Sequence, residues 1–186
     1  MTSGGAVRPA QPADAAVIAQ VRIDAWRATY RGMIPDPYLD AMSLSDSAAF
    51  WSRILATGSP LASVYVATEG DAIVGFAATN RRDPPKLGFD TELSAIYLAA
   101  GHKRRGLGRR LVSAVAAAQR ERGATGLLAW VVAQNKEARA FYEALGGELL
   151  VEQPFQWDGL DLVEAGYGFR DLDALAAAAG ANPALH

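Results

Sequence analysis

The stretch that decides the fold is Leu93-Ser-Ala-Ile-Tyr-Leu98, followed after three small residues by His102-Lys-Arg-Arg-Gly-Leu-Gly-Arg-Arg-Leu111. Its pattern predicts an apolar strand that leads through a basic, glycine-containing loop directly into a helix. A helix N-terminus presents unpaired backbone N–H groups and the positive end of its dipole, so it favours bound phosphate. Because Gly106 and Gly108 lack Cβ atoms, an anionic ligand can come close to the backbone. The stretch therefore predicts a pyrophosphate-binding loop.

Two well-known phosphate-binding motifs do not fit the spacing of this loop. Gly101 and Gly106 have the first gap of a P-loop, but Leu107 occupies the position of its lysine. Gly106-Leu-Gly108 can begin a dinucleotide-binding fingerprint, but the third glycine of that motif would fall at Leu111. Taken alone, the loop also fits a solvated basic turn or a nucleic-acid patch, so the rest of the chain has to decide.

Length and composition restrict the class of protein. The 186 residues fit one domain, and 51% hydrophobic with 20% charged residues is an ordinary globular composition. No apolar run reaches the roughly 18–20 residues that span a membrane. The first five residues, Met-Thr-Ser-Gly-Gly, lack the charged and apolar regions of a signal peptide. We therefore expect a cytoplasmic protein with no membrane partner.

Several chemistries are excluded by residues that the chain lacks. It has no cysteine, which removes disulfides, thiolate metal sites and a cysteine nucleophile. The two histidines, His102 and His186, offer neither a Ser-His-Asp triad nor a histidine metal site, and no metal is expected. The net charge of −2 argues against general nucleic-acid binding. Positive charge is instead concentrated in the loop, which suits a small polyphosphate: Lys103, Arg104, Arg105, Arg109 and Arg110.

Hydrophobic periodicity and turn signals predict an alternation of strands and helices. Strands are expected at residues 6–8, 63–68, 73–79, 92–98, 127–132, 148–152 and 162–169. Four helices are expected: from Asp14 to the break at Pro35 and Pro37, at residues 45–56, from the glycine loop to Gly123, and around residues 138–145.

Three further expectations concern segments outside these elements. Asp83-Pro-Pro is expected to form a turn, and Ala176–Ala179 either extends a final helix or frays. The chain shows no internal repeat and no interdomain linker. We expect one domain at residues 6–170, a flexible leader at 1–5 and an Ala-rich C-terminal tail at 171–186.

The order of these elements and three motifs resemble the GNAT superfamily of N-acetyltransferases over about residues 6–170. Lys103-Arg-Arg-Gly-Leu-Gly108 is similar to the family's cofactor loop, which begins with Arg or Gln; Lys103 departs from it but keeps the charge. Val131-Val-Ala-Gln-Asn135 is followed at the family's spacing by Ala138, Phe141, Tyr142, Leu145 and Gly146. Trp26-Arg-Ala-Thr-Tyr30-Arg-Gly32 resembles the first-helix segment of one large bacterial branch.

The resemblance implies an α/β GNAT fold with acetyl-CoA as cosubstrate and no metal. The fold has a mixed central sheet of about seven strands flanked by four helices, and its fourth and fifth strands splay apart into a cofactor cleft. The resemblance places Ile96, Tyr97 and Leu98 along the pantetheine arm, where a backbone amide would polarise the thioester carbonyl. The pyrophosphate would be bound by the loop residues Lys103, Arg104, Arg105, Gly106, Leu107, Gly108 and Arg109.

The resemblance also suggests an acid and a base for the reaction. Tyr142 would act as general acid toward the departing CoA thiolate, and its alternative role is a packed aromatic residue beside Phe141. Glu92 would act as general base for the acceptor ammonium, directly or through a water. In other family members a chain of waters does this, which would leave Glu92 as a surface charge.

Each of three more residues has two possible roles. Asn135 either hydrogen-bonds the pantetheine or caps the following helix. Trp26 and Tyr30 either border the acceptor pocket, together with the loop at residues 32–40, or belong to the core. The ligand-contacting roles rest on the resemblance, whereas helix capping and core packing follow from residue type and spacing.

The sequence therefore predicts an acetyl-CoA-dependent N-acetyltransferase that acts by direct attack of a primary amine in a ternary complex. The absence of cysteine removes the commonest acyl-enzyme route. The acceptor stays open between a small amine, an amino acid, an antibiotic and a protein N-terminus, and a homodimer is possible because dimers are frequent in the family. The alternative is a non-catalytic CoA-binding or sensory module, against which Glu92 and Tyr142 argue.

Overall fold

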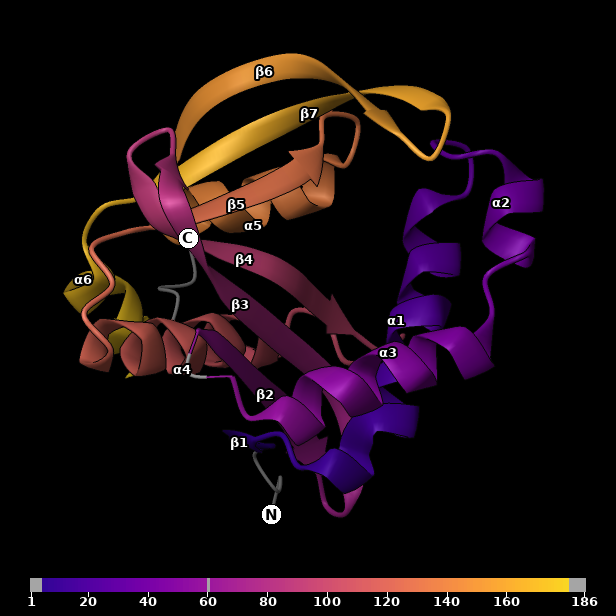
Figure 1. Cartoon of the computed structure of the whole chain (residues 1–186), viewed down its shortest axis with the longest axis horizontal. Helices are drawn as coiled ribbons and strands as arrows, with labels where there is room; N and C mark the ends of the chain where they lie inside the picture. Colours follow the sequence, from indigo (N-terminus) through magenta and orange to yellow (C-terminus); the bar gives the residue numbers. More distant parts are fainter. Residues whose placement is uncertain (1–4, 60, 181–186) are drawn as a thin grey trace.

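The computed structural model describes residues 5–59 and 61–180, which form one mixed sheet with helices on both of its faces (Figure 1). The strands are β1 (Ala6–Pro9), β2 (Ala62–Glu69), β3 (Ala72–Lys86), β4 (Phe89–Leu98), β5 (Leu127–Val132), β6 (Glu148–Trp157) and β7 (Leu160–Phe169). The helices are α1 (Ala15–Tyr30), α2 (Asp36–Asp40), α3 (Leu44–Thr57), α4 (Leu107–Glu121), α5 (Lys136–Ala144) and α6 (Leu172–Ala177).

The sheet has seven strands in the order β1-β2-β3-β4-β5-β7-β6. Only β4 and β5 run parallel among the strand pairs of the described chain, and every other neighbouring pair is antiparallel. The predicted fold class is therefore confirmed. The two short helices α2 and α6 add to the four helices that the sequence predicts.

Two layers of helices cover the sheet, each with its own hydrophobic core. On one face, α1 and α3 pack over β2–β4 through residues such as Ile18, Trp51 and Phe76. On the other face, α4, α5 and α6 pack over the sheet through residues such as Leu111 and Tyr167. A third and smaller core joins the end of α1 and α2 to β5, β6 and β7.

A β-bulge at Ser94 changes which face of the sheet the side chains of β4 reach. Leu93 pairs with Thr79 and Ala95 pairs with Ala78, so Ser94 has no partner in the ladder. Leu93 packs in the core under α4, whereas Ala95, two residues later, packs in the core under α1. The bulge thus redirects the C-terminal half of β4, as bulges do beside functional sites.

The pairing of β4 with β5 covers only three residue pairs, which begin at Thr91–Leu127 and end at Leu93–Ala129. Beyond the bulge, Ala95–Leu98 are bonded to β3 on one side and to no strand of the described chain on the other. The two strands therefore form a wedge that opens toward their C-terminal ends, as the resemblance to the GNAT superfamily implies.

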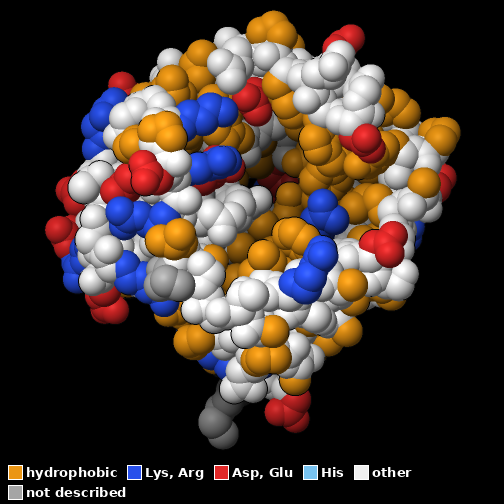
Figure 2. Space-filling view, in the orientation of Figure 1, with side chains coloured by type: hydrophobic (Ala, Val, Ile, Leu, Met, Phe, Trp, Pro, Cys, Tyr) orange, Lys and Arg blue, Asp and Glu red, His pale blue; other side chains and the backbone are white. Residues whose placement is uncertain are grey.

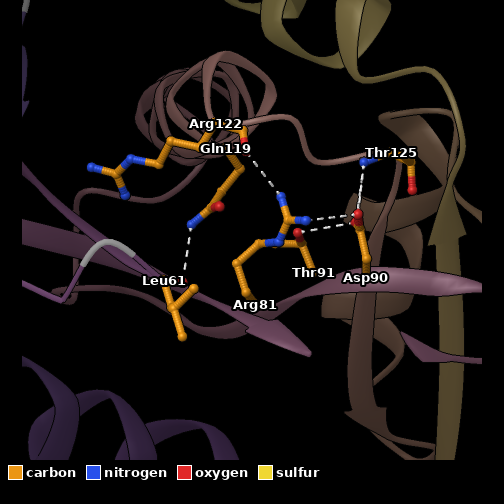
Figure 3. A network of polar contacts seen from close by, with 7 residues as sticks. All are labelled: Leu61, Arg81, Asp90, Thr91, Gln119, Arg122 and Thr125. Atoms are coloured by element: carbon orange, nitrogen blue, oxygen red, sulfur yellow. Dashed lines mark hydrogen bonds and ion pairs between the residues drawn. The ribbon is translucent and has the colours of Figure 1, made fainter. Parts of the chain in front are cut away.

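Polar contacts hold the closed end of this wedge (Figure 3). The Asp90 carboxylate, at the start of β4, accepts the backbone N–H of Thr125 at 3.1 Å and the Arg81 guanidinium at 3.1 Å. Arg81 also donates to the carbonyl oxygen of Arg122 at the end of α4. Although burial raises the pKa of Asp90, the Thr125 donors and the Arg81 charge lower it more, and the pKa lies below its ordinary value.

A buried amide holds the same end of α4 against β2 and β3. Gln119 is fully buried, and its Nε2 donates to the hydroxyl oxygen of Thr79 at 2.9 Å and to that of Ser63 at 3.2 Å. Arg122 donates to Ser63 and to the carbonyl oxygen of Ala62, each at 2.8 Å. These bonds fix the C-terminal end of α4 and leave its N-terminal end beside the open side of the wedge.

One predicted turn is wrong. Asp83-Pro-Pro lies inside β3, and the chain reverses instead at Leu87 and Gly88, both with positive φ. The reason is that the ladder with β4 skips from Arg81–Thr91 to Lys86–Phe89, so the prolines occupy positions where no backbone N–H is needed for pairing.

The predicted tail is helical in part. Residues 172–177 form α6, and its Leu172 and Leu175 are 5% and 2% exposed against the core under α4. Residues 181–186 of that tail and residues 1–4 of the predicted leader lie outside the described residues. The domain boundaries at 6 and 170 stay predictions.

We expect Asp90→Asn to destabilise the protein by about 1–3 kcal/mol, the range for a charged hydrogen-bond acceptor. A carboxyl whose folded pKa is lowered contributes stability above its unfolded pKa and loses it as the pH falls through the folded pKa. The difference between the two proteins should therefore be full at neutral pH and shrink below about pH 4. Urea unfolding at several pH values measures it. Asp71→Asn, in the exposed β2–β3 turn, is the control; an equal loss there would contradict the assignment.

Candidate functional site

The basic loop joins the end of β4 to α4 and presents the N-terminus of that helix. Gly106 is the N-cap residue with φ of +79°, and no side chain caps the helix there. The first helical N–H groups are consequently left for a ligand. Gly108 lies inside the first turn with helical geometry, and a Cβ atom on it would stand 3.3 Å from the Phe141 ring. Gly106 thus allows the turn, and Gly108 allows α4 to approach α5.

Carboxylates hold two of the loop's cations. Lys103 Nζ lies 2.8 Å from Glu137 Oε2 on α5, and Arg105 lies 2.9 Å from Glu69 Oε1 at the end of β2. His102 Nδ1 approaches the same Glu69 at 3.3 Å. Ion pairs therefore hold the loop to α5 on one side and to β2 on the other.

A cavity of about 1030 Å³ runs from this loop through the wedge to α1. Figure 2 shows the corresponding face hollowed near its centre, with hydrophobic side chains around the opening and Lys or Arg side chains at its border. The volume lies at the upper end of the range for small-molecule pockets, about 300–1,000 Å³, and suits a long ligand with a charged end.

Most of the predicted site residues line this cavity. They include all three of Ile96, Tyr97 and Leu98, and also Lys103, Arg104, Arg105, Gly106, Gly108, Arg109, Asn135, Tyr142 and Tyr30. Three do not. Leu107 is buried in the core under α4 with 2% exposure, Trp26 lines a neighbouring cavity, and Glu92 lies outside the lining.

Tyr142 is both a packed aromatic residue and part of the cavity wall. Its side chain is 5% exposed, and its ring lies 5.6 Å from that of Phe141 and 5.7 Å from that of Tyr167. Burial raises its pKa, and the neighbouring phenols of Tyr97 and Tyr30 raise it further. The hydroxyl is therefore protonated at neutral pH, as a general acid requires.

Two other phenols and an amide surround Tyr142. Burial raises the pKa of Tyr30, and the Asn135 side chain opposes the rise. Burial, then the Tyr30 phenol, raises the pKa of Tyr97. Asn135 caps α5, because its side-chain oxygen accepts the N–H of Ala138 at 3.1 Å. Asn135 therefore caps α5, as one of its two predicted roles requires, and it also lines the cavity.

Glu92 is held by an arginine of the β3–β4 hairpin. Both Nε and Nη2 of Arg82 donate to Glu92 Oε2, the first at 2.8 Å. Glu92 stands beside Leu128 in the parallel ladder, so it faces away from α4, toward the α1 side of the sheet. The structure places this carboxylate on the same side as Tyr97 but does not bring it to Tyr142.

Several residues of the cavity wall were not predicted from the sequence: Ser94, Ala25, Thr29 and Trp130. Lys86 Nζ lies over the Trp130 ring, 4.2 Å from its centroid, in a cation–π contact. No signal in the sequence marks the bulge at Ser94. Trp130 is the one aromatic residue in an otherwise aliphatic strand, and this exception could have marked it as a residue of the cavity wall.

The sequence model of the Acetyltransferase (GNAT) family matches residues 23–147. The chain belongs to this family. The matched segment contains β4, the glycine loop and α5, so it covers the wedge and the cavity described above. The prediction that the chain is an N-acetyltransferase is confirmed at this level.

Individual relatives agree with the assignment. The N-acetyltransferase YuaI of Bacillus subtilis strain 168 is 35% identical over 170 residues, 91% of this chain and 95% of its own. The PaiA N-acetyltransferase of Thermoplasma acidophilum, solved with coenzyme A, is similar with a TM-score of 0.69 and 17% identity over 90% of this chain and 99% of its own. YncA of Salmonella typhimurium, solved with acetyl-CoA, has a TM-score of 0.67 and 20% identity. The match covers 90% of this chain and 94% of the YncA chain.

Two features are absent from the part of the chain that the structure describes. No helix within residues 5–59 and 61–180 is long and apolar enough to cross a membrane. Over the same residues, no group of three or more His, Asp or Glu side chains is arranged to hold a metal ion.

We expect Gly106→Ala to weaken acetyl-CoA binding by roughly 10-fold, because a Cβ atom strains the positive φ and shifts the free N–H groups. Gly123→Ala is the matched control, since Gly123 has φ of +81° at the other end of α4. Both variants should lose similar stability, and only Gly106→Ala should raise the Kd in calorimetry. Equal Kd values of the two variants for acetyl-CoA would show that the loop does not bind this ligand.

Proposed function

We propose that the protein transfers the acetyl group of acetyl-CoA to a primary amine by direct attack in a ternary complex. The observation that carries the proposal is the cavity that joins the free N-terminus of α4 to the unpaired edge of β4. It combines a phosphate-binding end with a strand edge that can bond an extended amide chain.

The proposed position of the donor follows from these two features. The pyrophosphate would bind the loop at Arg104–Arg109, and the pantetheine arm would pair with β4 in place of β5. A backbone N–H of Ile96–Leu98 on the open edge would donate to the thioester oxygen and stabilise the tetrahedral oxyanion. Coenzyme A and acetyl-CoA in the solved structures of PaiA and YncA support this donor.

Tyr142 would protonate the departing thiolate. Its phenol is protonated, lies in the cavity wall and is held in place by rings on two sides. The acceptor must lose a proton before attack, and we propose that a water carries it toward Glu92, on the α1 side of β4. The two hydrogen bonds from Arg82 fix the position of that carboxylate.

A screen of primary amines with acetyl-CoA, read by release of free thiol, tests the proposal. Acetyl-CoA alone should raise the melting temperature, because a ligand that binds only the folded state stabilises it. Amines should then accelerate thiol release above the rate of acetyl-CoA hydrolysis. Stabilisation without any amine-dependent release would favour the non-catalytic CoA-binding module, and no stabilisation would refute the donor.

Tyr142→Phe removes the proposed proton donor and keeps the packed ring. We expect kcat to fall by roughly 100-fold, within the range for a general acid, with little change in acetyl-CoA affinity. Tyr65→Phe removes a phenol hydroxyl on β2, outside the cavity wall, and is the control. Turnover of Tyr142→Phe at the parent rate would return this residue to a packing role.

A further inference from the structure

A second cavity adjoins the first on the α1 side of the sheet. Its volume is about 210 Å³, and it lies between α1, α3 and the strands β2–β4. Ser94, Ala95 and Tyr97 belong to the walls of both cavities, so the two meet at the bulge of β4. Whatever fills the second cavity therefore lies next to the proposed position of the thioester.

The walls of this second cavity are mostly apolar. Helix α3 contributes Phe50, Trp51 and Ile54, and α1 contributes Trp26. Trp51 packs edge-on against Phe76 with ring centroids 5.0 Å apart, so this wall is rigid. A space of this size and lining takes an apolar side chain of a small molecule and gives no counter-charge to a second ammonium group.

One cation of the wall lacks an anionic partner. Arg22 lines the cavity, is half-buried, and stacks on Trp26 at 5.0 Å from its ring centroid. Within residues 5–59 and 61–180 it forms no ion pair and no side-chain hydrogen bond, whereas Arg27 in the last turn of α1 and Arg31 just after this helix do.

Arg22 and Tyr97 line the same second cavity. The Arg22 charge opposes the rise in pKa that burial causes at Tyr97 and at Tyr38. Asp158 raises the pKa of Tyr38 but makes no ion pair with Arg22 in the described chain. A half-buried guanidinium without an anion is costly, and a carboxylate is its best bidentate partner.

We propose that the acceptor is an amino acid with an apolar side chain, whose carboxylate is bound by Arg22. The side chain would pack against Trp26 and Trp51, and the amine would reach the first cavity past Tyr97. This rests on the proposed function and names the substrate class of that site.

The neutral amine nitrogen attacks the thioester carbon, and the C–N bond forms as the C–S bond breaks. The nitrogen gives up one proton through water toward Glu92, and the thiolate takes one from Tyr142. The products are an N-acetyl amino acid and coenzyme A.

Matched acceptors test the role of the carboxylate. L-Phenylalanine, its primary amide and phenethylamine share one side chain and differ in the group that Arg22 would bind; L-leucine and isoamylamine repeat the comparison. We expect kcat/KM for the free amino acid to exceed that of the amide and of the amine by roughly 10- to 100-fold. A diamine should be poorer still, because its second ammonium would face Arg22.

Arg22→Gln tests the residue itself. It should raise KM for the amino acid so that the preference over phenethylamine falls to near one, with the change in KM larger than that in kcat. Calorimetry of L-phenylalanine added to the complex with coenzyme A should show the same loss of affinity. Arg53→Gln, on the exposed side of α3, should keep the full preference.

The outcomes separate this inference from the function on which it rests. Equal use of amine and amino acid, or an undiminished preference in Arg22→Gln, would overturn the carboxylate site and leave amine acetylation standing. Absence of thiol release with every acceptor, although acetyl-CoA binds, would overturn both.

Discussion

The short parallel pairing of β4 with β5 is the constraint on which the rest of the structure depends. Three residue pairs join the strands, and the bonds of Asp90 to Thr125 and Arg81 hold that end closed. The edge beyond Leu93 has no strand partner in the described chain and lines the large cavity, so its backbone N–H and C=O groups are open to a ligand. An extended ligand with amide groups can bond them as an added strand would.

The bulge at Ser94 connects this edge to both faces of the sheet. It lets Ile96 and Leu98 pack toward α4, while Ala95 and Tyr97 face α1. A ligand that lies along the edge therefore has the basic loop at one end and the aromatic walls of α1 at the other. The donor and the acceptor can then approach the same point of β4 from opposite sides, which suits direct transfer in a ternary complex.

Local sequence was sufficient for the parts of the site that depend on neighbouring residues. The glycine loop, the cap at Asn135 and the apolar run of β5 each lie within a few residues, and their patterns predicted them. Contacts across the sheet were not readable in this way. The pairing of Glu92 with Arg82 and the place of Trp26 in a second cavity depend on the length of the β3–β4 hairpin and on the packing of α1 against α3. The turn predicted at Asp83-Pro-Pro was wrong for the same reason. Pro84 and Pro85 can lie inside β3 only because the ladder with β4 has a gap there.

Hydrogen–deuterium exchange with and without acetyl-CoA tests the central claim, that the donor replaces β5 along the open edge of β4. Exchange should slow in Ser94–Leu98 and in the loop at residues 104–110 when acetyl-CoA binds. Thr91–Leu93 should change little, because β5 already pairs with these residues. Protection spread evenly over β4, or confined to segments away from the wedge, would contradict the account.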